Sequence, residues 1–77
     1  MRVEILSPDK LIFEGEADSI QLPGMDGSFG ILNNHAPIVA SLKDGKVIIK
    51  NNGSKQEFDV KGGVVEVLKN KVIVLSD

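Results

Sequence analysis

The sequence predicts a small all-β domain, an antiparallel β-sandwich or flattened barrel of about eight to ten short strands. Three observations support this fold class. Apolar residues alternate with polar ones or run in short β-branched blocks, turn signals recur every several residues, and no stretch shows the apolar spacing of a helical face. No linker, repeat or low-complexity segment interrupts the chain, so residues 1–77 are expected to form a single domain.

The first strands follow from alternation and from proline. Val3 and Ile5 share one face, and this strand should stop near Ser7 because Pro8 cannot donate a ladder hydrogen bond. A second strand is expected over residues 11–13 and a third over residues 17–22, which Pro23-Gly24 closes.

The next stretch, residues 22–38, is the most distinctive part of the chain. Gly24, Gly27 and Gly30 stand at three-residue spacing before the run Ile31-Leu32-Asn33-Asn34-His35-Ala36-Pro37-Ile38. Glycine is favoured where the backbone takes a positive φ or approaches another chain closely. The spacing therefore predicts a long, shaped loop, which is the expected place for function.

Five more short strands are expected over residues 38–42, 46–50, 56–60, 64–68 and 72–75. Asp44-Gly45, Asn52-Gly53 and Lys69-Asn70 are predicted to be hairpin turns between them, because Asn and Gly tolerate left-handed conformations. The last two strands are apolar on both faces, which predicts a central position in the fold or cover by a partner.

Composition excludes several classes of function. The net charge is −2 and the nine Lys and Arg are spread singly, so nucleic acid is not an expected ligand. The chain has no apolar stretch of the about 20 residues that cross a bilayer and no secretory leader, so exposure to the cytosol is expected. With no Cys to form a disulfide, a thin core of this size favours stabilisation by a partner surface.

The residues that could suggest catalysis or ligand binding are better explained by structural roles. The glycine series lacks both the dinucleotide-binding spacing and the Gly-Lys-Ser/Thr of a phosphate loop. His35, the single histidine, is expected to fix loop backbone, and Glu14, Glu16 and Asp18 are expected to solvate a strand and discourage edge pairing. No Gly-x-Ser-x-Gly sequence is present. We therefore expect no catalytic residue, no metal site and no cofactor.

One alternative is a stand-alone binding module or a biotinyl- or lipoyl-type carrier domain. Such domains are small β-sandwiches that present a modified lysine at a hairpin tip. The lysines expected at tips here are Lys43 and Lys69, and neither lies in the Met-Lys-Met or Asp-Lys-Ala context of those carriers.

Five motifs in order give the chain a clear resemblance to one family, the N-terminal β-sandwich domain of the epsilon subunit of F-type ATP synthases. The motifs are Phe13-Glu14-Gly15, Gly24-Met25-Asp26-Gly27-Ser28-Phe29-Gly30-Ile31, His35-Ala36-Pro37, Gly62-Gly63-Val64-Val65-Glu66-Val67 and Val72-Ile73-Val74-Leu75. The match covers nearly the whole chain.

The resemblance implies a non-catalytic rotor subunit of the central stalk that links the gamma subunit to the membrane c-ring and supports coupling of proton transport to ATP synthesis. It implies a c-ring contact through Met25, Asp26, Gly27, Ser28 and Phe29. It implies a gamma contact through Ser7, His35, Ala36, Pro37, Ile38, Val39 and Ala40.

The resemblance also implies a location, the cytoplasmic face of the bacterial inner membrane, where the subunit is bound peripherally through the F1 sector. Fuller members of the family continue into a C-terminal helical hairpin. The sequence ends at Asp77, so that helical domain is expected to be absent and its inhibitory role is not carried over.

Overall fold

The computed structural model describes residues 1–77 and contains seven β-strands and no helix, which confirms the all-β fold class. The strands are β1 Arg2–Leu6, β2 Leu11–Glu16, β3 Ser19–Gly24, β4 Gly27–Leu32, β5 Ile38–Asn51, β6 Ser54–Leu68 and β7 Lys71–Ser76. No helix of the length and apolarity needed to span a membrane is present.

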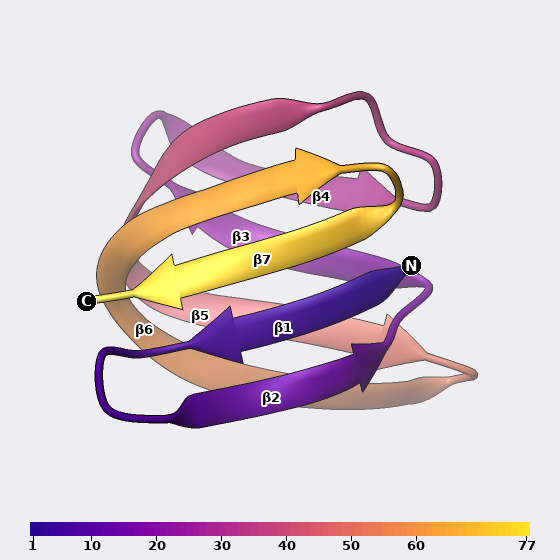
Figure 1. Ribbon diagram of the computed structural model, residues 1–77, viewed down its shortest axis with the longest axis horizontal. Helices are drawn as coiled ribbons and strands as arrows, with labels where there is room; N and C mark the ends of the chain where they lie inside the picture. Colours follow the sequence, from indigo (N-terminus) through magenta and orange to yellow (C-terminus); the bar gives the residue numbers. More distant parts are fainter.

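All seven strands belong to one sheet, in the order β2-β1-β7-β6-β5-β3-β4, that folds back on itself into two layers. Strands β1, β2 and β7 lie in one layer, and β3 and β4 lie behind them in the other (Figure 1). The long β5–β6 hairpin curves through both layers. The sheet is mixed, because β1 and β7 pair in parallel whereas all other neighbours are antiparallel as expected.

The strands are fewer and longer than the sequence predicted because β5 and β6 are each continuous where the sequence predicted two short strands, and the predicted turn at Asp44-Gly45 lies within β5. Asp44 and Gly45 pair with Lys61 and Val60 inside the β5–β6 ladder. A Cβ at Gly45 would lie 2.8 Å from Cβ of Pro23. This glycine therefore permits close packing of β5 on β3, and it does not form a hairpin turn.

The matching bend in β6 occurs at Gly62 and Gly63, whose φ angles are 101° and 128°. A Cβ on Gly63 would lie 1.9 Å from the carbonyl oxygen of Leu75. Only glycine fits here, because the position combines a positive φ with contact between two backbones. The bend turns β6 from one layer into the other.

Two hairpin turns lie where the sequence predicted them. Asn52 and Gly53 join β5 to β6 with φ angles of 51° and 81°, and Lys69 and Asn70 join β6 to β7 with φ angles of 52° and 61°. Consecutive positive φ angles define the hairpin turn whose twist matches that of the flanking strands.

The glycine-rich stretch is a tight hairpin, and the prediction of a long loop is wrong. Only Met25 and Asp26 separate β3 from β4, and Gly24 pairs with Gly27 at the turn. Gly27 has a φ of 127°, and the ring of Phe29 covers Gly24 so closely that a Cβ there would lie 2.8 Å from it. The first two glycines thus serve the hairpin itself.

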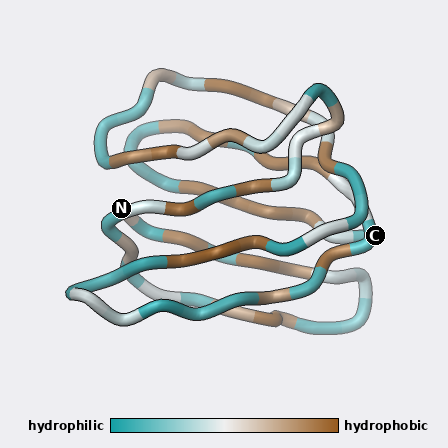
Figure 2. The backbone as a smooth tube through the Cα atoms, turned by 180° about the vertical axis from the view of Figure 1, so that it is seen from behind, coloured by the Kyte–Doolittle hydropathy of each residue, from teal (hydrophilic) through white to brown (hydrophobic).

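Side chains from both layers fill a single core of 15 buried apolar residues. Along the strands apolar residues alternate with polar ones (Figure 2), as expected when one face of each strand is buried. Strands β6 and β7 are central in the sheet, and both of their faces carry apolar residues, as the sequence indicated.

Candidate interaction surfaces

One surface of the molecule, here called the outer face, consists of the outward side chains of β2, β1, β7 and the adjoining halves of β6 and β5. Pairing across these strands aligns Leu11, Leu6, Leu75, Val64 and Ser41 in one row. Leu11 and Leu75 are each about half exposed, at 49% and 51%. Residues directly opposite one another in neighbouring strands share a face of the sheet. The four apolar residues of this alignment, on β2, β1, β7 and β6, therefore form a continuous apolar row on the surface, with Ser41 at its end.

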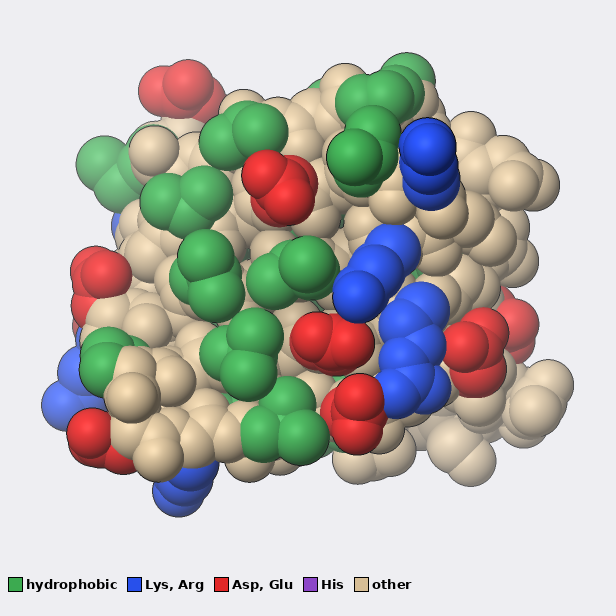
Figure 3. All heavy atoms as spheres, viewed as in Figure 1, with side chains coloured by type: hydrophobic (Ala, Val, Ile, Leu, Met, Phe, Trp, Pro, Cys, Tyr) green, Lys and Arg blue, Asp and Glu red, His purple; other side chains and the backbone are tan.

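The outer face changes from apolar to charged along the strands. The next row contains Val39, Glu66, Ile73, Glu4 and Glu14. Beyond it, Arg2 pairs with Glu14 at 2.6 Å and Lys71 pairs with Glu4 at 3.4 Å. Figure 3 shows the apolar side chains gathered over one half of this face and the charged ones over the half nearer the N-terminus.

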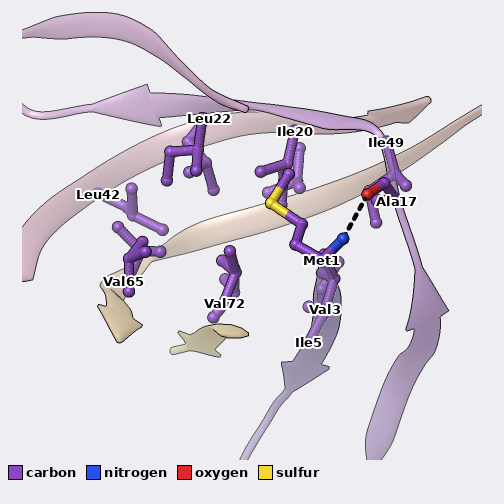
Figure 4. Packing of buried hydrophobic residues seen from close by; sticks show 14 of the residues in the cluster. Met1, Val3, Ile5, Ala17, Ile20, Leu22, Leu42, Ile49, Val65 and Val72 are labelled. Atoms are coloured by element: carbon purple, nitrogen blue, oxygen red, sulfur yellow. Dashed lines mark hydrogen bonds between the residues drawn. The ribbon is translucent and has the colours of Figure 1, made fainter. Parts of the chain in front are cut away.

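The loop between β4 and β5 lies beside the charged half and is held at two points. The backbone amide of Asn34 donates a hydrogen bond to Oδ1 of Asn70, at 2.8 Å, in the β6–β7 turn. The α-ammonium group of Met1 donates to Oδ1 of Asn33 at 2.6 Å and to the carbonyl oxygen of Ala17 at 3.0 Å. The bond from Met1 to Ala17 is visible beside the core in Figure 4. The hydrogen bonds of Asn33 and Asn34 therefore hold the part of the loop that precedes His35.

Within this loop, the His35 ring contacts the backbone of the next residue, Ala36. Its Nδ1 lies 2.7 Å from the carbonyl oxygen of Ala36, which places the proton on Nδ1 when the ring is neutral. This geometry agrees with the expectation that His35 fixes loop backbone.

The tip of the β3–β4 hairpin packs against the start of β5. The amide of Met25 donates to the carbonyl oxygen of Ser41 at 3.0 Å, and the Met25 side chain is 59% exposed. The tip and Val39–Ser41 line an open groove of about 540 Å³. Asp26, Gly27 and Ser28 are exposed, whereas Phe29 is half-buried over Gly24.

The structure does not bring all predicted contact residues together. Ser7 lies in the β1–β2 turn, where its amide and hydroxyl donate to the carbonyl oxygen of Lys10 at 2.9 and 3.3 Å. Val39 lies on β5, on the far side of β7 and β6 from β1, although it faces the same surface. Ile38 and Ala40 point toward the core.

The residues that lie between Ser7 and Val39 on the outer face were not predicted as contact residues from the sequence. They are the outward apolar residues Leu6, Val64, Ile73 and Leu75. The sequence does show that both faces of the last two strands are apolar. This pattern indicates that a partner covers one face, but it does not indicate which face.

A further compositional feature joins the hairpin to the loop. From Gly27 to Leu42 the chain contains no Lys, Arg, Asp or Glu. The centre of a protein interface is depleted of charged residues in the same way. This uncharged segment, which contains Gly27 to Phe29 of the predicted ring contact and residues 35–40 of the predicted gamma contact, therefore has the composition of an interface centre.

Comparison with a family model matches residues 1–77 to the family described as "ATP synthase, Delta/Epsilon chain, beta-sandwich domain". The chain is 43% identical to an ATP synthase epsilon chain of Leptospira borgpetersenii, with all of this chain aligned to 61% of that protein. It is 35% identical to an epsilon chain of Caulobacter vibrioides, with all of this chain aligned to 90% of that protein. The chain thus spans about three-fifths of some relatives and most of others.

Solved structures with the same fold include chains of two mitochondrial ATP synthases. A chain in a Euglena gracilis structure of OSCP, F1 and the c-ring superposes with a TM-score of 0.89 at 22% identity, over 96% of this chain and 48% of that one. A chain in the Tetrahymena thermophila central stalk and c-ring structure superposes with a TM-score of 0.79 at 22% identity, over 97% and 61%. At this identity the likeness establishes the fold.

Proposed function

Because the chain belongs to the family of ATP synthase delta/epsilon chain β-sandwich domains, we propose that it acts as the epsilon-type subunit of an F1Fo ATP synthase. In this role it is a non-catalytic rotor component of the central stalk that holds the gamma subunit to the c-ring. It thereby supports coupling of proton transport to ATP synthesis. The proposal places it at the cytoplasmic face of the bacterial inner membrane, bound peripherally through the complex.

The observation that carries this proposal is the graded outer face. Its apolar row takes side chains from four neighbouring strands and lies beside paired charges. A contiguous exposed apolar patch with a polar rim is typical of a protein–protein interface. We assign the gamma contact to this face together with Ser7 and residues 35–40, and the ring contact to the hairpin tip, residues 25–29.

The carrier alternative receives less support from the geometry. Lys43 lies within the continuous strand β5 and not in a hairpin turn. Lys69 does lie in an exposed turn, but a carrier role needs a covalent modification that mass spectrometry of natively expressed protein would detect. An unmodified chain that purifies with the gamma subunit would exclude this alternative.

The proposal is tested by purification of the chain with the gamma subunit and the c-ring of its own organism. We compare Leu75→Glu, which places a charge in the apolar row, with Ser54→Glu, which places the same charge at the exposed tip of the β5–β6 hairpin. Leu75→Glu should weaken gamma binding by about tenfold or more, because an unpaired charge must be desolvated in the interface.

Ser54→Glu should bind gamma like the wild type. Unchanged thermal melting of both isolated variants would show that the fold is intact. Equal gamma affinities for the two variants would exclude the outer face as the contact, and failure of the wild-type chain to bind gamma or the ring would refute the proposed function.

A further inference from the structure

The two edge strands of the sheet differ in how they are protected. Strand β2 carries Glu14 and Glu16, and Glu14 is paired with Arg2. Strand β4, at the other edge, reads Gly-Ser-Phe-Gly-Ile-Leu and contains no charge, no proline and no bulge. Natural proteins normally protect an edge with such devices, because an unprotected edge is a template for another strand.

Alternate residues of β4 have backbone groups without a partner in the chain. β4 pairs only with β3, and no backbone hydrogen bond outside that ladder and no side-chain hydrogen bond involves residues 27–32. The two-residue turn makes Gly24 and Gly27 a hydrogen-bonded pair, so alternation along the ladder directs Phe29 and Ile31 to β3. The amides and carbonyls of Ser28, Gly30 and Leu32 therefore face the open edge.

Hollows lie on both sides of this edge. One, of about 450 Å³, is lined on the outside of the sheet by Gly30, Leu32 and Ile48 among others. The other is the groove of about 540 Å³ that Phe29 shares with Val39–Ser41. Successive side chains of a strand point to opposite sides, so a strand added to β4 would place its side chains alternately in the two hollows.

The chemistry of the edge restricts the occupant. The run from Gly27 to Leu42 offers no counter-ion to a charged ligand. Each hollow is lined by a single charged residue, which is Lys50 in the outer hollow and Asp26 in the groove, so neither presents a cluster of charge of one sign. Leu32, at 67% exposure, offers apolar contact beside the free backbone. Gly30 leaves space, because a Cβ there would meet only the carbonyl oxygen of Ile20, at 3.8 Å.

We propose that β4 binds an extended, uncharged segment of a stalk partner by strand addition, with Ser28, Gly30 and Leu32 as the hydrogen-bonding positions. This inference rests on the proposed function, because it specifies how a subunit of the complex is held. It adds a backbone-mediated contact at the edge of the sandwich to the side-chain contacts of the outer face.

Amide hydrogen exchange of the wild-type chain, free and in complex with the gamma subunit and the c-ring, tests the inference directly. The amides of Ser28, Gly30 and Leu32 should exchange about tenfold more slowly, or slower still, in the complex, whereas those of Phe29 and Ile31 are already protected in the free chain. If the complex forms and the three edge amides exchange as fast as in the free chain, strand addition is excluded and the proposed function stands.

A matched pair of variants at Gly30 gives a second test. Gly30→Pro removes one edge N–H, which an edge strand tolerates when that group faces solvent, whereas Gly30→Ala keeps it. Gly30→Pro should weaken partner binding about tenfold relative to Gly30→Ala, with equal melting temperatures for the free variants.

Equal affinities for the two folded variants would overturn the inference. If Gly30→Pro does not fold, amide exchange of the wild-type complex decides alone. If the wild-type chain does not assemble with either subunit, both the inference and the proposed function fail.

Discussion

Replacement of Gly63 by alanine should be far more damaging than the same replacement at Gly27, although the φ angles of the two residues are nearly identical. Their φ angles are 128° and 127°. Holding a non-glycine residue in this region costs about 1–3 kcal/mol, and both variants share that cost. Their surroundings differ, because a Cβ at Gly27 has no neighbour within 4 Å, whereas at Gly63 it would lie 1.9 Å from the carbonyl oxygen of Leu75.

To relieve this contact, β6 and β7 must separate where Gly63 pairs with Ser76 and Val64 pairs with Leu75. Each backbone hydrogen bond lost there costs about 0.5–1.5 kcal/mol, and buried groups left without a partner add to that cost. We expect Gly63→Ala to lose at least about 2 kcal/mol more than Gly27→Ala. For a chain of this length the total stability is about 4–12 kcal/mol, so a combined loss of at least about 3–5 kcal/mol should lower the urea midpoint of Gly63→Ala sharply.

Urea unfolding followed by circular dichroism measures both variants against the wild type. Gly53→Ala, with a φ of 81° and no neighbour within 4 Å, is a further control for the effect of φ alone. Equal losses of stability for Gly63→Ala and Gly27→Ala would show that the contact with Leu75 is relieved at no cost, which would refute the reasoning.

Two further predictions concern single contacts. Asn33→Ala removes the acceptor 2.6 Å from the buried Met1 ammonium and should lower the free energy of unfolding by about 1–3 kcal/mol. Asn34→Ala should change it by less than about 1 kcal/mol, because the hydrogen bond of Asn34 to Asn70 uses the Asn34 backbone. Urea unfolding of the two variants measures the difference. Lys46, hydrogen-bonded to Asp59 at 3.0 Å, has a raised pKa because of that bond and the Asp59 charge. Stability from this pair is present below the pKa of lysine in the unfolded chain and is lost as pH rises through the higher folded value. Asp59→Asn should therefore leave the melting temperature nearly unchanged at neutral pH, since the pair is exposed, and remove any extra fall in stability at strongly alkaline pH; a large loss at pH 7 would contradict this.

The turns that the sequence predicted correctly are those whose chemistry is local. Asn52-Gly53 and Lys69-Asn70 adopt positive φ angles within the pair itself. The turn predicted at Gly45 was wrong because this residue is small in order to pack against Pro23, which is distant in sequence. The parallel pairing of β1 with β7 was equally hidden, since no local pattern specifies which distant strands become neighbours.

The interaction surfaces likewise combine features that the local sequence predicts with features that depend on distant strands. Alternation along β6 and β7 revealed that both faces are apolar, but the alignment of Leu6, Leu75 and Val64 in one row depends on the register of three strands. The glycine-rich segment was correctly identified as distinctive, yet Gly24 and Gly27 are explained by the hairpin. Only Gly30 lacks a structural requirement of its own.

The parallel pairing of β1 with β7 also determines how the molecule resists being pulled. The two strands are neighbours, and the N-terminus and C-terminus lie at opposite ends of them (Figure 1). A tension applied between the termini therefore acts along the strands and draws them past each other in shear. The evenly spaced bonds of a parallel ladder then share the force at the same moment, and the chain cannot be peeled open from its ends one bond at a time.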